Sequence, residues 1–416
     1  MTATTMRLQD QEAAAEFDIV SSAFHADPLP TLARMRGAGP LVQLKLPIVG
    51  RTWLTTTHAG SVELLKDHDR FVRDPGNAGS RTQERIIKVL PRTLGLLATN
   101  MLGLDDPAHR RLRSLVDQAF QRRGIATLEP TVAATADRLI DRMSRHAESD
   151  LMQDYCRDLP LSVICAMLGL PEKDHDWFKA WLGGLTDTAN FWAVVKAAPG
   201  VWRIVSYLRR VSRPGGGAHP GGLIAALREA EVEGGRLSED ELVSMIFLLF
   251  GAGQETTTHL IAGGLWALLT QESERRRLAD DPSLMPMAVE EMLRWVSPVQ
   301  MTKPRFARTD LDWQGMRFKR GTMFAAFLAA ANVDPAKFED PHRFDVGRHP
   351  NPHLSFGTGV HFCLGFQLAR LETRVAIERL MARYPHLSLA VPPERIAWRR
   401  RLGIRALASL PVRLAA

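Results

Sequence analysis

The glycine-rich segment from residue 356 to residue 365 constrains the fold of this chain more than any other part of the sequence. It places Cys363 on a predicted turn, because its three glycines permit backbone conformations that other residues avoid. A helix is predicted to follow, since apolar residues recur every three or four positions from 364 to 375. The amides of the turn and the positive end of that helix are expected to favour a thiolate. The segment therefore predicts a shielded thiolate that acts as a nucleophile or as a metal ligand.

A long helix is predicted from Ser238 to residue 270. Ser238 and Glu241 have the spacing of a capping box, so its start is well defined. Glycine, glutamate and threonine interrupt the apolar centre of the helix around residues 251–256. One interpretation is a flexible helix with a partly exposed Glu255. The other is that Thr256 donates a hydrogen bond to the carbonyl of Ala252 and opens a groove for water and a small diatomic ligand.

The chain of 416 residues contains no internal repeat or low-complexity linker, so we predict one large domain, residues 18–416, after a disordered tail, residues 1–17. Its 53 basic and 46 acidic residues give a net charge of +7, too diffuse to indicate nucleic-acid binding. Cys156, Cys165 and Cys363 form no C-x-x-C pair, which is typical of a reducing compartment. Without a signal peptide or spanning segment, we expect a soluble cytoplasmic protein that does not enter a membrane.

Helical patterns dominate the sequence, and the fold class is predicted to be mainly α with minor β. Strands are expected at Leu41–Leu46, at Thr52–Thr57, around 305–328 and after residue 386. Helices are expected around residues 108–120, 129–146, 158–169, 174–195, 200–211, 221–231, 238–270, 284–296 and 364–384.

The order F-x-x-G-x-x-x-C-x-G, formed by Phe356, Gly359, Cys363 and Gly365, resembles the haem-binding loop of the cytochrome P450 family. The resemblance covers residues 18–413 and implies the fold of the soluble bacterial members, with haem between the long helix and the helix after the cysteine. It implies a haem b cofactor, Cys363 as the iron ligand, and Phe356 and Gly357 as cofactor-binding residues.

The segment from Ala252 to Thr257 resembles the oxygen-binding helix of that family, A-G-x-(D/E)-T. The resemblance implies that Glu255 and Thr256 are a catalytic acid–alcohol pair, which delivers protons during the activation of dioxygen.

Glu291 and Arg294 form an E-x-x-R pair, which alone is common on solvated helices. The family resemblance adds an arginine from a P-x-R-F segment, supplied here by Arg343. It implies a buried ion network under the haem loop, with a structural role and no part in bond-making.

The two carboxylates of a haem need cations near them. His109 and Arg113 lie four positions apart on a predicted helix and match the family pattern H-x-x-x-R, while Arg305 and His361 match its remaining contacts. Each of these residues alone is more typical of a surface residue or a satisfied core histidine. Together they imply a clamp for the haem carboxylates.

The resemblance implies a monooxygenase that inserts one oxygen atom from O₂ into a lipophilic small molecule by hydroxylation or epoxidation. Electrons from NAD(P)H are expected through a separate ferredoxin or flavodoxin and its reductase, and a monomer is expected. Alternatives are peroxide-driven oxidation or oxidative coupling on the same fold, a hydrolase built on Cys363 and His361, and a non-catalytic haem sensor.

Two groups of residues complete these expectations. The substrate pocket is expected to include Leu248, Ala252, Val299, Met301 and Ile404. A docking face for the redox partner, or an ordinary solvated basic face, is expected around Arg110, Arg111, Arg122, Arg123, Arg370 and Arg374.

Overall fold

The computed structural model describes residues 17–47, 49–79, 100–175, 177, 191–233 and 235–415. Residues 1–16, which make up nearly all of the predicted tail, lie outside the described residues. Phe17 belongs to the fold, however, because its side chain is buried and the guanidinium of Arg34 lies 5.1 Å from the centre of its ring. The boundary between tail and domain stays a prediction.

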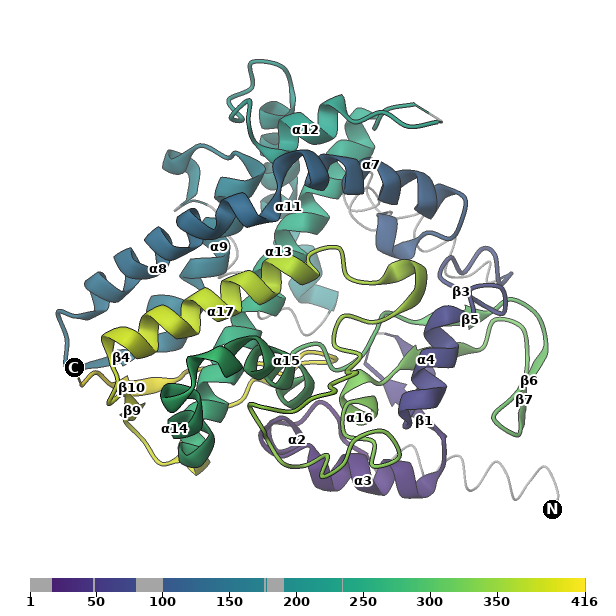
Figure 1. The fold of residues 1–416 in the computed structure, drawn as a ribbon. Helices are drawn as coiled ribbons and strands as arrows, with labels where there is room; N and C mark the ends of the chain where they lie inside the picture. Colours follow the sequence, from purple (N-terminus) through teal and green to yellow (C-terminus); the bar gives the residue numbers. More distant parts are fainter. Residues whose placement is uncertain are drawn as a thin grey trace.

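Helices form most of the described chain, as predicted (Figure 1). They begin with α2 (Ser22–Ala26), α3 (Leu29–Ala38) and α4 (His58–Lys66). The helices that follow are α7 (Ala108–Arg123), α8 (Glu129–Met143), α9 (Asp158–Leu168), α11 (Phe191–Ser212), α12 (Leu223–Glu229), α13 (Glu239–Thr270), α14 (Glu272–Asp280), α15 (Met285–Val296), α16 (Leu328–Ala331) and α17 (Phe366–Arg383). Part of the helix expected at 174–195 lies outside the described residues.

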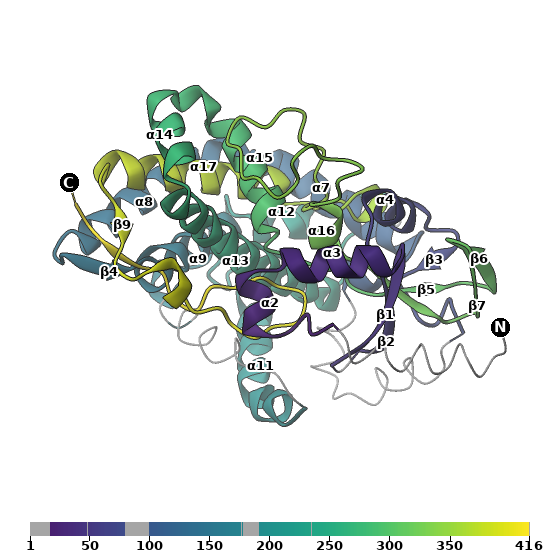
Figure 2. The same ribbon diagram turned by 90° about the horizontal axis from the view of Figure 1, so that it is seen from below.

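The longest helix, α13, runs through the interior and packs against α9, α11, α15 and α17 (Figures 1 and 2). Its predicted capping box is confirmed. The Ser238 hydroxyl accepts from the backbone N–H of Glu241 at 3.2 Å, and the Glu241 carboxylate accepts from the backbone N–H of Ser238 at 2.9 Å. No helix among the described residues is long and apolar enough to cross a bilayer.

The main sheet has five strands in the order β1-β2-β8-β5-β3 and lies on one side of the molecule (Figures 1 and 2). Its strands are β1 (Leu41–Leu46), β2 (Gly50–Thr55), β8 (Met323–Ala326), β5 (Arg305–Ala307) and β3 (Phe71–Val72). The pair β2–β8 is parallel, with Leu54 opposite Ala325, and the other pairs are antiparallel. The second predicted strand ends two residues early, because the Thr57 hydroxyl caps α4 by accepting from the backbone N–H of Gly60.

The remaining strands form two small units. The three-stranded sheet contains β4 (Glu148–Asp150), β10 (Pro411–Arg413) and β9 (Ser388–Leu389), and a hairpin joins β6 (Leu311–Trp313) to β7 (Met316–Phe318). The largest apolar core joins α8, α9, α13, α15 and α17, while a second core lies between the five-stranded sheet and the helices α2, α3 and α16. The mainly α class with minor β is confirmed.

Candidate active site

The segment that carries Cys363 is a tight loop between residue 355 and the start of α17. Its glycines are needed where the sequence predicted. Gly357 and Gly359 have φ of +67° and +76°, and a Cβ on Gly359 would lie 2.6 Å from the carbonyl oxygen of Leu65 in α4. The backbone N–H of Cys363 donates to the carbonyl of Phe356 at 3.0 Å and closes the loop.

The thiol of Cys363 is less acidic than the sequence indicated. Burial raises its pKa, and the backbone N–H of Gly365 and the charges of Arg113 and Arg370 offset this only in part. In the loop by itself, desolvation outweighs the amide and the two arginine charges, so the expected thiolate depends on the metal ion that the sulfur would bind. A metal cation facing the sulfur reverses this balance, since a coordinating thiol is deprotonated outright.

Basic side chains gather beside this loop from four separate parts of the chain. His109 and Arg113 come from α7, Arg305 from β5 and His361 from the loop itself, as predicted, and Arg73 after β3 joins them. The rings of His109 and His361 lie 4.1 Å apart, and Arg113 donates to the carbonyl of Phe362 at 2.7 Å.

The charges of this basic cluster affect one another strongly. Burial, followed by the charges of Arg73, His109, Arg305 and Arg113, lowers the pKa of His361 to about 2. Burial lowers the pKa of Arg305 to about 10, and burial and the neighbouring Arg305 lower that of Arg73 to about 9. The buried charges of Arg73 and Arg305 favour a bound anion.

The donor atoms of the basic cluster are poised for such an anion. His109 Nε2, His361 Nδ1, Arg305 Nε and Arg73 Nε are buried and have no hydrogen-bond partner among the described residues. Buried donors without partners are rare, and each needs an explanation. The two carboxylates of a haem bound over Cys363 fit this requirement in charge and in hydrogen-bonding capacity.

The centre of α13 has the local geometry predicted for it. Thr256 Oγ1 donates to the carbonyl of Ala252 at 2.6 Å. Although α13 is an interior helix, Ala252 is exposed and Leu248, Glu255 and Thr256 are only half-buried, whereas the neighbouring Gln254 is buried. Among the described residues, one face at the centre of the helix is therefore partly accessible, as a site for a small ligand requires.

Glu255 has a partner that the sequence did not indicate. Its carboxylate pairs with the guanidinium of Arg401, and both side chains are about one-quarter exposed. The carbonyl of Arg401 is in turn 2.8 Å from Nε2 of His25 in α2. Arg401 comes directly before Leu402, so this ion pair joins α13 to the segment expected to line the substrate pocket.

The ion network under the loop differs from the prediction in one member. Glu291 and Arg294 are fully buried and joined by two hydrogen bonds of 2.7 Å, as expected. The second arginine is Arg348, whose Nε donates to Glu291 at 3.2 Å. The assignment of Arg343 was wrong: its side chain is 59% exposed and lies 3.7 Å from Glu274. Only its backbone joins the network, since its carbonyl accepts from Arg294 at 2.9 Å.

The expected substrate residues fall into two groups. Val299 pairs with Ile404, and the backbone N–H of Gln300 donates to the carbonyl of Gly403 at 2.9 Å, so the segments 298–302 and 402–405 lie side by side. Met301, in the first of these segments, pairs with Phe327. Leu248 and Ala252 lie on the accessible face of α13.

Comparison with known proteins identifies the family. The family model described as Cytochrome P450 matches residues 216–396. The polyketide biosynthesis cytochrome P450 PksS of Bacillus subtilis is 37% identical over 394 residues, which cover 94% of this chain and 96% of PksS. This chain belongs to the cytochrome P450 family. Cytochrome P450 monooxygenase PikC of Streptomyces venezuelae is 36% identical, with 94% of this chain and 92% of PikC covered.

Solved P450 structures share the fold. A myxobacterial cytochrome P450 in complex with myristic acid has a TM-score of 0.88 at 38% identity, covering 96% of this chain and 99% of that one. The structure of PksS from B. subtilis has a TM-score of 0.83 at 36% identity, covering 96% and 100%. The predicted P450 fold is thus confirmed.

This P450 is a monooxygenase whose cofactor is a thiolate-ligated haem, supplied with electrons from NAD(P)H through partner proteins. The hydrolase alternative is therefore wrong. Its proposed base, His361, is also poorly suited to that role, because a histidine with a pKa of about 2 is a weak base.

Sequence reasoning missed three residues of the site: Arg73, Arg348 and Arg401. Arg73 follows the two-residue strand β3, and Arg401 lies in a run of three arginines, so neither has a local pattern that marks it. Arg348 lies five positions after Arg343, and a search for a second arginine downstream of the P-x-R-F segment could have found it.

Proposed function

We propose that this P450 inserts one oxygen atom from O₂ into a lipophilic small molecule by hydroxylation or epoxidation. The observation that carries the proposal is the basic cluster beside Cys363, whose buried donors have no partner within the described ranges and fit an anion of the kind haem provides. Relatives named mycinamicin IV hydroxylase/epoxidase, vitamin D(3) 25-hydroxylase and 6-deoxyerythronolide B hydroxylase support both reaction types and a lipophilic substrate.

In this proposal Cys363 ligates the iron, and Phe356 and Gly357 shape the loop around the sulfur. His109, Arg113, Arg305, His361 and Arg73 hold the two carboxylates of the haem. The bound haem supplies the redox chemistry that activates dioxygen. Glu291, Arg294 and Arg348 have no chemical step and hold the loop from below.

Thr256 and Glu255 move protons in this proposal. The Thr256 hydroxyl donates to the carbonyl of Ala252, so its oxygen lone pairs stay available to accept from a water beside the accessible face of α13. Glu255 relays protons from solvent when its carboxylate is not paired with Arg401. Arg401 is a positioning residue that sets how often this carboxylate is available.

The substrate is proposed to bind between the accessible face of α13 and the paired segments at Val299 and Ile404. Leu248, Ala252 and Met301 complete an apolar lining, which favours a lipophilic guest over a polar one. A relative described as a polyketide biosynthesis P450 and a structural neighbour that holds myristic acid make polyketides and fatty acids the first compounds to screen.

Electrons are proposed to arrive from a separate ferredoxin or flavodoxin with its reductase. Arg110 and Arg122 are exposed and fit an acidic partner, although Arg110 also pairs with Asp106 at 2.7 Å. Arg111, Arg370 and Arg374 are engaged in ion pairs with Glu241, Glu290 and Glu129, which reduces their share in docking. The side chain of Arg123 lies outside the described residues.

The proposal is tested by spectra and by turnover of the purified protein. The reduced carbon monoxide complex is expected to show the red-shifted Soret band of thiolate ligation, and Cys363→His to lose it. Cys156→Ala, a variant of a buried cysteine elsewhere, is the control and should keep the band. With surrogate redox partners, NAD(P)H should support formation of an oxygenated product. Product formed only with hydrogen peroxide would instead support the peroxide-driven alternative.

A further inference from the structure

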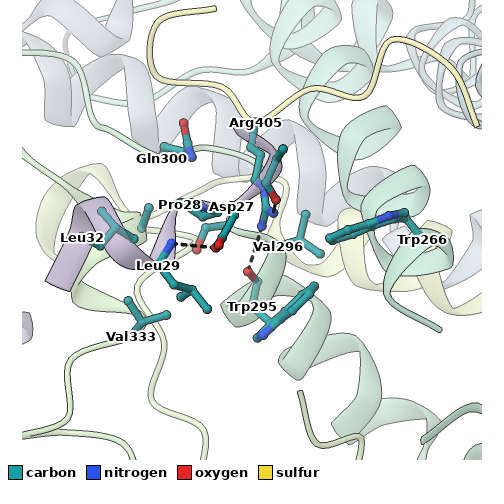
Figure 3. Close-up of a pocket in the computed structure, with 13 residues that line it drawn as sticks. Asp27, Pro28, Leu29, Leu32, Trp266, Trp295, Val296, Gln300, Val333 and Arg405 are labelled. Atoms are coloured by element: carbon teal, nitrogen blue, oxygen red, sulfur yellow. Dashed lines mark hydrogen bonds between the residues drawn. The ribbon is translucent and has the colours of Figure 1, made fainter. Parts of the chain in front are cut away.

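A second cavity lies among the N-terminal helices and the carboxyl ends of α13 and α15 (Figure 3). Its volume is about 230 Å³, and it is bordered by Leu29, Leu32, Trp266, Trp295, Gln300 and Arg405, among others. None of the residues assigned above to the haem or to the substrate lines it. It is therefore a separate site.

The walls of this cavity suit a flat aromatic ring. The rings of Trp266 and Trp295 stack with 5.5 Å between their centres and 27° between their planes. Leu29, Leu32 and Val333 lie on the opposite side of the cavity (Figure 3). A cavity of about 150 Å³ holds benzene, and drug-sized ligands occupy about 300 Å³ or more. The volume found here lies between these values and favours one substituted ring or two fused rings.

Gln300 supplies a polar contact that the protein leaves unused. Its side chain is 1% exposed, and its Nε2 has no hydrogen-bond partner among the described residues. Figure 3 shows the amide end turned toward the other lining residues. The backbone is already satisfied, because the N–H donates to Gly403 at 2.9 Å and the carbonyl accepts from Ala329 at 3.1 Å. A buried donor in this state stabilises a ligand that brings an acceptor.

Arg405 adds further donors on the same wall. Its guanidinium lies over the rings of three tryptophans, the nearest being Trp398 at 4.6 Å. It donates to the carbonyls of His25, Ala26 and Trp295 at 2.8, 3.2 and 3.5 Å, three bonds for a group with five N–H donors. Among the described residues, Asp27 at the exposed mouth is the one carboxylate that borders the cavity. The inner wall therefore offers donors and requires an acceptor.

We propose that this cavity binds a small aromatic compound with a carbonyl group, the ring against Trp266 and Trp295 and the oxygen accepting from Gln300. Successive side chains of an extended segment point to opposite sides, so Gln300 lies behind Val299 and Met301. This step rests on the proposed location of the substrate beside Val299 and Met301. A ligand bound to Gln300 restricts the motion of this segment and so raises the affinity of the protein for its substrate.

The binding test uses the haem-loaded protein with its iron blocked by an azole, so that a probe can bind only elsewhere. The probe is para-bromoacetophenone, and para-bromoethylbenzene is the match of similar shape without the oxygen. Crystals soaked in the ketone are expected to show an anomalous bromine signal in this cavity, at the end of the ring that points away from Gln300. Calorimetry is expected to give about three- to tenfold weaker binding for the ethyl compound, the worth of one hydrogen bond.

Two variants and a control complete the design. Gln300→Leu removes the unpartnered amide and keeps a similar side-chain volume, so the fold is kept. It should weaken binding of the ketone by the same factor and leave binding of the ethyl compound unchanged. Leu29→Trp narrows the mouth and should abolish binding of both. Gln153→Leu, at an exposed glutamine of the π-helical turn Met152–Cys156, should change nothing. Equal affinity for the two probes, or an unchanged Gln300→Leu variant, overturns the proposed site.

Coupling to the substrate is measured separately, without the azole. Saturating ketone should lower the substrate dissociation constant in the wild type and leave it unchanged in Gln300→Leu. If the ketone binds in the cavity but the dissociation constant of the substrate does not change, the proposed effect on substrate affinity is overturned, whereas the proposed binding site is retained. Neither result depends on which residues move protons, so failure here is distinct from failure of the proposed function.

Discussion

Replacing Glu291 by alanine should destabilise this P450 far more than replacing Arg343. Glu291 is fully buried and accepts five hydrogen bonds, two from Arg294 and one each from Arg348, Asn351 and the backbone of Asp345. Arg294, also fully buried, donates in addition to the carbonyls of three residues in the segment before the cysteine loop, Asn332, Pro341 and Arg343. The pair therefore ties α15 to that segment.

The expected costs follow from what each substitution leaves behind. Without Glu291, the buried charge of Arg294 has no counter-charge, which costs about 3–5 kcal/mol of a total stability of about 5–15 kcal/mol. Without Arg348, Arg294 still neutralises Glu291, so the loss is about 2 kcal/mol, the worth of one or two hydrogen bonds to a charged group. Arg343 is 59% exposed with one distant ion pair, and its loss costs less than about 1 kcal/mol.

The assay is urea unfolding of the three haem-loaded alanine variants, followed by the Soret absorbance, together with haem content per protein. We expect the order Glu291→Ala, then Arg348→Ala, then Arg343→Ala, from most to least destabilised. If Arg343→Ala loses as much stability as Glu291→Ala while Arg348→Ala stays near the wild type, the buried network described here is refuted and the arginine of the P-x-R-F segment is the true partner.

Three further outcomes are expected. Thr256→Ala should keep haem and substrate binding but form severalfold less product per NAD(P)H, with the difference recovered as hydrogen peroxide; unchanged coupling contradicts a role in proton transfer. Arg401→Ala should free the carboxylate of Glu255 and alter the pH profile of product formation, while the exposed Arg400→Ala should not. Although burial opposes it, hydrogen bonds from Arg370 and His353 lower the pKa of Glu290 to about 2. Ionised Glu290 therefore stabilises the fold above its ordinary pKa of 4.5, and the stability gap to Glu290→Gln in urea should close as pH falls from 5 toward about 2.

The features predicted correctly from the sequence are those whose physical cause is local. The capping box at Ser238 depends on two residues three positions apart, and the Thr256 bond to Ala252 on residues four apart. The need for glycine at 359 also has a local component, a positive φ, although the close approach of Leu65 became visible only in the structure. These features could be predicted because each depends on residues close together in the sequence and not on the tertiary packing.

The errors concern partners that are distant in sequence. Arg343 lies in the P-x-R-F segment and Arg348 follows it closely, so the sequence alone does not decide which of the two arginines contacts Glu291. The backbone decides between them: the carbonyl of Arg343 is turned inward to accept from Arg294, while its side chain points to solvent. The pairing of Glu255 with Arg401 spans 146 positions and has no motif, so only the fold could reveal it.

The charge balance of the site explains why its residues look unusual one by one. Cys363 lies where burial raises the pKa of its thiol, so the sulfur lacks a cation. Beside it, His109, Arg305 and His361 hold buried nitrogen atoms that have no partner in the described part of the chain, so this side can take an anion. A single flat group with a central metal ion and two carboxylates meets both needs at once. The motifs could name these residues separately, but that the two deficits lie side by side, and that one cofactor removes both, follows only from the three-dimensional arrangement.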